Sequence, residues 1–266
     1  KTMVHIDWSE VSSNVVCRED VAGVGTFIPG SKAGKKVLKD FLASKLNDYD
    51  ASRNAINIDG QSNLSPYISH GNISRRRIVQ ELLTVTGETI ENSFDDTQNG
   101  SNGTIGSVAA FIEECVVRAE LTENFCHHNA HYASSSGFPE WARVTLQKAS
   151  SDKREYVYSQ DQFEKAKTHD PLWNAAQMQM VQTGKMHGYM RMYWAKKLLE
   201  WSASPEEALA TGIYLNDHYS IDGGDPNGYV GLLWSIVGVH DRPWTERAVF
   251  GKIRYMNYGG LMRKFD

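Results

Sequence analysis

The stretch that decides the fold is THDPLWNAAQMQMVQTGKMHGYMRMYWAKKLLEW, residues 168–201. Its apolar residues recur at helical spacing on both sides of Gly184, which predicts two helices joined by a short break. Trp194 and Trp201 are seven residues apart, so they share one face of the second helix. Trp173 lies on the first helix, which the break allows to fold back alongside. The stretch therefore predicts a helical hairpin that is rich in tryptophan.

Helical patterns extend outward from this hairpin over most of the chain. Ser74 precedes a helical segment that Gly87 would end, and Ser204 is followed by Pro205 and two glutamates, a typical helix start. Further helical patterns cover residues 31–49, 107–129 and 222–238, and residues 95–104 read as a loop or hairpin-like break.

Strand patterns are few, so the sequence predicts an all-α, mainly helical protein. We expect residues 1–30 to form an irregular N-terminal arm or the remnant of a linker. Residues 31–266 are then expected to form one helical domain, which is a usual size for a chain of 266 residues.

Composition narrows the class of protein. The three cysteines (Cys17, Cys115 and Cys126) are scattered and odd in number, which favours a reducing compartment over a disulfide framework. No run of eighteen apolar residues occurs, so we expect an intracellular, soluble protein without a membrane partner. The formal net charge of −4 gives no whole-chain signal for nucleic acid.

The C-terminal segment differs from the rest of the chain in its charge. Residues 241–266 hold six Lys or Arg against three acidic residues, interleaved with Trp244, Tyr255 and Tyr258. This pattern fits a surface that contacts phosphates, and it equally fits an ordinary solvated face.

Four other constellations have both a functional and a structural interpretation. The three hairpin tryptophans could be a core cluster or stepping stones for electron transfer. Arg191 with Asp222 and Asp225 could be a structural ion pair or a ligand site on a glycine-rich turn. The polar turn GQSNLSPY (60–67) offers donors for a phosphate but also resembles a capping turn. The stretch CHHNAH (126–131) lacks a second pair of ligands, so no metal site is expected.

Together, these blocks resemble the flavin-binding C-terminal domain of class II cyclobutane pyrimidine dimer photolyases, in the photolyase/cryptochrome family. The blocks that carry the resemblance are SNLSPY (62–67), FIEECVVRAELTENFC (111–126), residues 168–201, YLNDHYSIDGGDPNGYVGLLWSI (214–236) and FGKIRYMN (250–257). One departure is ISHGN (68–72), where the family reads LHFGQ, so that Ser69 and His70 stand at positions near the flavin.

The resemblance implies an all-helical domain that holds FAD, active in its reduced form. It implies light-driven repair of pyrimidine dimers in UV-damaged DNA by a photo-lyase, a carbon–carbon lyase, acting on a flipped-out lesion. We expect this chain to lack the family's N-terminal α/β antenna domain and an antenna chromophore, and we expect a monomer. The alternatives are a cryptochrome-like photoreceptor without repair activity and a helical domain that binds DNA or protein without flavin.

The resemblance also assigns roles to individual residues. The residues that it assigns to cofactor binding are Tyr49, Ser62, Asn63, Leu64, Ser65, Arg118, Arg191, Asn216, Asp222 and Asp225. The catalytic positions are Glu114, which would face the dimer, Asn216, which would lie near flavin N5, and Met192 and Trp234, which would pack on the dimer. Electron transfer falls to Trp194, Trp173 and Trp201. DNA around the lesion would be contacted by Arg242, Trp244 and Arg254.

Overall fold

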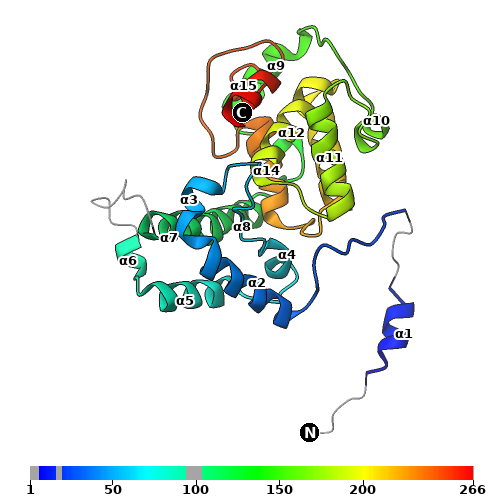
Figure 1. Ribbon diagram of the computed structural model, residues 1–266. Coiled ribbons are helices and arrows are strands. Elements are labelled where there is room, and N and C mark those ends of the chain that lie inside the picture. Colours follow the sequence, from blue (N-terminus) through cyan, green and yellow to red (C-terminus); the bar gives the residue numbers. More distant parts are fainter. Residues whose placement is uncertain (1–5, 16–19, 94–103, 266) are drawn as a thin grey trace.

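The computed structural model describes residues 6–15, 20–93 and 104–265, and this part of the chain is helical (Figure 1). Within it there is no strand, and the only β-type pairing is an isolated bridge between Arg247 and Gly251. The prediction of an all-α protein is therefore confirmed.

The helices follow one another along the chain with connections of very different length, the longest described one running from Val237 to Tyr258. They are α1 (Trp8–Ser13), α2 (Ser31–Ser44), α3 (Tyr49–Ser52), α4 (Ser65–Ser69), α5 (Arg75–Thr86), α6 (Ile90–Ser93), α7 (Thr104–Ile112), α8 (Arg118–His128), α9 (Glu140–Lys148), α10 (Gln160–Glu164), α11 (Pro171–Thr183), α12 (Gly188–Trp201), α13 (Pro205–Tyr219), α14 (Pro226–Val237) and α15 (Tyr258–Phe265).

Local sequence signals account for the helix ends. The Asp170 carboxylate accepts hydrogen bonds from the backbone N–H groups of Leu172 and Trp173 at the start of α11. Gly184 ends that helix with a φ of 72°, a left-handed conformation that glycine adopts without steric cost. The expected Ser74 and Ser204 caps also form, because each side chain accepts a backbone N–H of its helix.

The helix from Thr104 to His128 is less regular than its sequence predicts. It runs through α7 and α8, but Glu113–Val117 between them is a π-helical turn. The apolar spacing gave no sign of this interruption. Such turns occur frequently at functional sites, and this one contains Glu114.

Two hydrophobic clusters make up the core. The larger one lies among α9 and α11–α14 and includes Trp173, Trp194 and Leu198, each at most 1% exposed. The smaller one lies among α2, α5 and α7 and includes Phe41 and Leu82. Helix α8 packs against α14 and so connects the two groups of helices, which lie side by side in Figure 1.

The start of the N-terminal segment stands apart from both clusters (Figure 1), whereas Phe27, near its end, packs against the smaller one. The segment is not irregular throughout, because it contains the short helix α1, none of whose residues is buried. The loop expected at residues 95–104 lies outside the described residues except for Thr104, which begins α7. The division into an arm (1–30) and one helical domain (31–266) stays a prediction. None of the described helices is long and apolar enough to cross a membrane.

The smaller cluster provides a test of the core. Leu82 on α5 is fully buried, so Leu82→Ala should lower the free energy of unfolding by roughly 2–5 kcal/mol, measured by chemical denaturation. Val85 lies on the same helix but is 61% exposed, so Val85→Ala should change that free energy by less than about 0.5 kcal/mol. Equal effects of the two substitutions would contradict the assignment of this cluster as core.

Candidate functional site

The hairpin of α11 and α12 brings three tryptophans into one buried array. The rings of Trp194 and Trp173 are stacked, with their centroids 6.1 Å apart and 8° between their planes. The ring of Trp201 meets Trp173 edge-on, with a centroid distance of 6.2 Å. Trp173 therefore lies between the other two, an order that the sequence spacing left open. All three side chains are at most 3% exposed.

Hydrogen bonds fix the rings of this array. The Trp173 indole N–H donates to the backbone oxygen of Trp194 at 3.0 Å. The Trp194 indole N–H donates to the side-chain oxygen of Gln177 at 2.9 Å. A buried indole N–H needs such a partner, so these bonds also explain why the rings keep one orientation. Gln177 was not singled out from the sequence, because its partner is seventeen residues away.

The outer end of the array continues into a group of smaller rings. The Trp201 ring lies 4.8 Å from the ring of His169 and 5.9 Å from that of Tyr158. His169 in turn stacks on Tyr156 at 3.7 Å, and Tyr156 is 38% exposed. A continuous set of aromatic contacts thus leads from the buried array to the surface.

A second constellation gathers charged and polar groups from three separate segments. The side chains of Arg191 and Asp222 lie 3.9 Å apart, and they are 23% and 11% exposed. The Lys185 ammonium donates to the side-chain oxygen of Asn63 at 3.1 Å. Asn63 itself has a φ of 57°, which is uncommon for a residue other than glycine and occurs often at ligand sites. The predicted grouping of Arg191, Asp222 and the 62–65 turn is therefore present.

The charges in this cluster shift one another's pKa. Burial acts to raise the pKa of Asp222, but the positive charges of Arg191 and Lys185 and the Ser65 hydroxyl outweigh it, and the pKa is lowered. Burial lowers the pKa of Lys185 to about 8, although Asp222 opposes that shift. Lys185 was missed in the sequence, where nothing marks it except its place in the short α11–α12 connection.

The same cluster retains unused hydrogen-bonding capacity. Both the Arg191 Nε and the Asp222 Oδ1 are buried without a hydrogen-bond partner, and the approach of Arg191 Nη2 to Asp222 Oδ1, at 3.9 Å, is too long for a hydrogen bond. Buried polar atoms of this kind are rare in folded proteins unless a ligand or water meets them. The donor and acceptor set therefore fits a bound polar group. Ser62 and Leu64 lie beside Asn63 in the segment that leads into α4, and Ser65 begins that helix.

Two other residues assigned to the cofactor have protein partners. The Asn216 amide donates to Asp217 at 3.0 Å and accepts from the Ser220 hydroxyl at 3.3 Å. It also lies so close to Gly228 that a Cβ there would stand 2.7 Å from its nitrogen. Asp225 caps α14 by accepting the Asn227 N–H. Only Asp222 of the two predicted aspartates forms an ion pair with Arg191.

The acidic π-helical turn pairs with two arginines. Glu114 accepts a hydrogen bond from the Arg53 guanidinium at 2.6 Å, and its side chain is 43% exposed. Glu113 pairs with Arg118 at 2.8 Å, and the Arg118 guanidinium also lies 4.9 Å from the Trp234 ring centroid. Arg53 was not anticipated, because sixty-one residues separate it from Glu114. Tyr49 is buried between Phe41 and Phe111, and burial raises the pKa of its hydroxyl.

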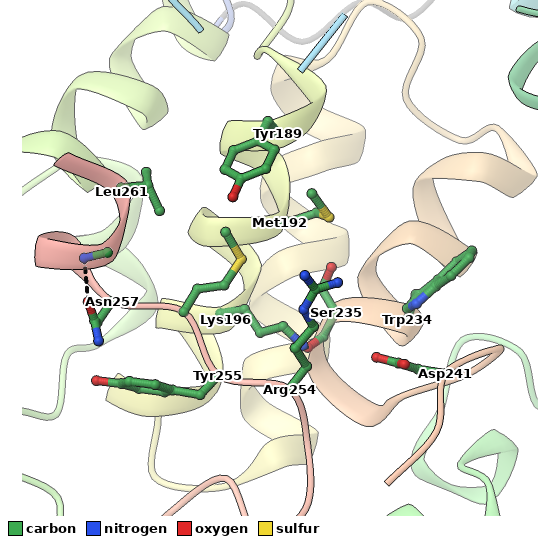
Figure 2. A pocket seen from close by; sticks show the side chains of 12 residues that line it. Tyr189, Met192, Lys196, Trp234, Ser235, Asp241, Arg254, Tyr255, Asn257 and Leu261 are labelled. Atoms are coloured by element: carbon green, nitrogen blue, oxygen red, sulfur yellow. Dashed lines mark hydrogen bonds between the residues drawn. The ribbon is translucent and has the colours of Figure 1, made fainter. Parts of the chain in front are cut away.

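A cavity of about 250 Å³ opens beside Met192 and Trp234 (Figure 2). Its walls come from α12, α14 and the C-terminal segment, and Arg254 and Asp241 line it from the last of these. Lys196 also lines it and donates to the backbone oxygen of Ser235 at 2.5 Å, and burial lowers the pKa of that lysine to about 7. The structure therefore places Met192 and Trp234 at one cavity. Glu114 and Asn216 are not among its lining residues.

The three residues predicted to contact DNA meet at the surface. The Trp244 ring is 39% exposed and lies between two guanidinium groups, Arg242 at 5.4 Å and Arg254 at 4.9 Å from its centroid. Its indole N–H donates to Asp241 at 3.2 Å, which holds the ring in place. The result is a rigid aromatic and cationic knob next to the cavity. No group of His, Cys, Asp or Glu that could hold a metal ion occurs among the described residues.

The chain is similar in sequence to proteins named deoxyribodipyrimidine photo-lyase. It is 48% identical to the protein of this name from Potorous tridactylus over 261 residues, which is 98% of this chain and 46% of that protein. It is 49% identical to the one from Arabidopsis thaliana, over 98% of this chain and 51% of that protein. For Methanothermobacter thermautotrophicus the identity is 45%, over 90% of this chain and 49% of the relative. The chain thus spans about half the length of the curated relatives it matches.

Two solved structures share the fold. A class III photolyase from Agrobacterium tumefaciens superposes with a TM-score of 0.59 at 18% identity, over 90% of this chain and 43% of that one. A cryptochrome from Synechocystis superposes with a TM-score of 0.63 at 19% identity, over 91% of this chain and 44% of that one. No protein-family model matches the sequence. The chain is a homologue of deoxyribodipyrimidine photolyases, with a helical fold also found in a cryptochrome.

The lowered pKa of Lys185 predicts a pH effect on stability. Between about 8 and 10.5 the unfolded chain keeps a proton on this lysine that the folded protein has lost, so stability should rise with pH. One such group contributes a slope of at most about 1.4 kcal/mol per pH unit. Lys185→Met should remove this contribution, which denaturation curves of both proteins between pH 7.5 and 10.5 would measure. Parallel pH profiles for the two proteins would be inconsistent with a buried ammonium at this position.

Proposed function

We propose that this photolyase homologue repairs cyclobutane pyrimidine dimers in UV-damaged DNA, using light. The observation that carries the proposal is the sequence identity of 45–49% over at least 90% of the chain with proteins named deoxyribodipyrimidine photo-lyase. Because the chain covers about half of those relatives, their activity, cofactor and substrate are proposed for it.

FAD is the proposed cofactor, and the polar cluster is the proposed place for it. Arg191, Asp222 and Lys185 with the 62–65 turn would hold its polar chain, because the cluster has a buried donor and a buried acceptor still open. When bound in its reduced form, FAD supplies the excited-state electron that splits the dimer.

Substrate binding is proposed for the cavity beside Met192 and Trp234. The damaged bases must leave the DNA stack to enter a pocket of this kind. The knob of Trp244, Arg242 and Arg254 next to it suits this step, because guanidinium groups bind phosphates and an exposed indole can stack on bases. A salt-dependent affinity for DNA would follow from these two cations.

Glu114 is the proposed residue that faces the dimer. Its contact with Arg53 keeps the carboxylate oriented in the absence of substrate. Binding of a dimer would have to displace or share that contact. Asn216, which the resemblance assigns to flavin N5, already has its amide oriented by Asp217, so a ligand would meet a fixed group.

The tryptophan array is the proposed route by which an electron reaches an oxidised cofactor. Ring centroids 6.1 and 6.2 Å apart within the core give short steps between neighbouring indoles, and Trp173 is the middle step. The array also packs the hairpin, so its core role and its electron-transfer role are compatible.

The main test combines a spectrum with illumination. The purified protein should be yellow, should release FAD on denaturation, and in its fully reduced form should restore an oligonucleotide that contains a thymine dimer only under blue light. Flavin photoreduction without any repair would favour a cryptochrome-like photoreceptor. A colourless protein that releases no flavin would contradict both and would favour a helical binding domain.

Trp173→Phe tests the array at its middle step. Phenylalanine fills most of the space but is not readily oxidised, so photoreduction of bound flavin should lose most of its rate. Repair by chemically prereduced protein should be unchanged, because the array acts before the repair reaction. The lost indole hydrogen bond should lower stability by about 1 kcal/mol. Trp8→Phe, at a tryptophan that is 68% exposed on α1, is the matched control and should leave photoreduction unaltered.

A further inference from the structure

A second cavity, of about 510 Å³, lies at the outer end of the tryptophan array. The side chains of Trp201, His169 and Tyr156 form part of its wall, and the remainder comes from the segments around residues 153–155, 197–200 and 247–259. Its volume is within the range of small-molecule sites. This cavity is distinct from the places proposed for the dimer and the cofactor. It shares only Tyr255 and Asn257 with the cavity beside Met192.

The cavity gives small molecules access to an otherwise enclosed array. Trp173 and Trp194 are at most 1% exposed and Trp201 is 3% exposed. Of these three, only Trp201 lines either described cavity. A donor dissolved in water therefore comes closest to the array at Trp201, where it can approach the indole directly.

The wall charges favour an anion. Four cationic side chains line the cavity (Lys153, Arg154, Lys197 and Arg247) against three acidic ones (Glu155, Asp170 and Glu200). Glu200 and Lys197 pair with each other at 2.5 Å, which leaves three cations against two acids. One of those acids, Asp170, already accepts hydrogen bonds from α11 and from Tyr193.

Arg247 is an exposed cation of this wall. It stacks on Tyr255, with its guanidinium 4.9 Å from the ring centroid, and it has no acidic partner among the described residues. Lys197 is only 5% exposed, and its ammonium lies 5.3 Å from the Trp201 ring centroid. Because Glu200 already pairs with that ammonium, a positive charge that develops on Trp201 would be stabilised further by an anion in the cavity.

We propose that this cavity binds a small anionic electron donor of the ene-diolate class, which reduces Trp201 after the array has given up an electron. The inference rests on the proposed function, because it requires a light-driven electron from the array. The donor gives one electron to the oxidised Trp201 indole, which returns to its neutral form. The donor loses its remaining hydroxyl proton to solvent and becomes a radical anion, and no covalent bond to the protein forms.

Ascorbate is the probe for this site, used with the full chain. In the dark and under argon, saturation-transfer NMR should detect ascorbate bound to the protein. Under constant blue light, the rate of flavin photoreduction should reach a plateau as ascorbate increases. Arg247→Gln should raise both the dissociation constant and the half-saturating concentration by about two- to fivefold, the range for loss of one exposed ion pair. Added salt should act in the same direction.

Two controls make the result specific. Arg143→Gln removes an exposed arginine on α9 that does not line the cavity, and it should match the unmodified protein. Dithiothreitol, an uncharged donor at neutral pH, should give a rate that rises linearly and is unaffected by Arg247→Gln. A linear ascorbate dependence with the same slope in both proteins, or equal dark binding by both, would overturn the inference.

Failure of this inference can be told apart from failure of the proposed function. If the protein photoreduces its flavin and repairs dimers but shows no saturation with ascorbate, only the donor site is wrong. If the protein holds no flavin, the proposed function is wrong. The dark titration of Arg247→Gln against the unmodified protein still decides whether the anion site exists.

Discussion

The buried carboxylate of Asp170 holds the α11–α12 hairpin together, and the tryptophan array depends on that hairpin. One of its oxygens accepts the first backbone N–H groups of α11, and the other accepts the Tyr193 hydroxyl from α12. Burial and this bond to Asp170 raise the pKa of that hydroxyl, so it remains a donor. A single 5%-exposed side chain thus fixes where one helix starts and how the next lies against it. The stacking of Trp173 on Trp194 follows from that fixed geometry.

The polar cluster lies where the two hydrophobic groups of helices meet. Asn63 comes from the segment next to the smaller cluster, whereas Lys185, Arg191 and Asp222 come from the larger one. Neither group of helices alone contains the full set of donors and acceptors. A ligand bound at this point would contact both groups and would stabilise the folded protein in proportion to its affinity.

Features encoded by neighbouring residues were predictable from the sequence. The caps at Ser74, Asp170 and Ser204 and the glycine ends at Gly87 and Gly184 depend on side chains within a few residues of the backbone they affect. The shared face of Trp194 and Trp201 follows from helical geometry in the same way.

Features that depend on tertiary contact were not predictable. Gln177, Lys185 and Arg53 have partners 17, 122 and 61 residues away, so no local pattern marks them. The central place of Trp173 depends on how two helices cross rather than on spacing. The grouping of Arg191 with Asp222 or Asp225 was anticipated because a partly buried arginine needs an acidic partner, but only the structure shows that Asp222 forms the ion pair.

The π-helical turn at Glu113–Val117 has a consequence for the long helix that contains it. A π turn holds more residues than an α turn, so it rotates the residues that follow about the helix axis relative to an uninterrupted α-helix. Before and within the turn, Phe111 and Cys115 face the smaller cluster. After it, the Thr122 hydroxyl donates to Asn227 of α14. The rotation at this turn lets one continuous helix, from Thr104 to His128, pack a suitable face against each of two differently placed cores. Deleting a single residue in the turn would therefore misalign one half of the helix against its neighbours.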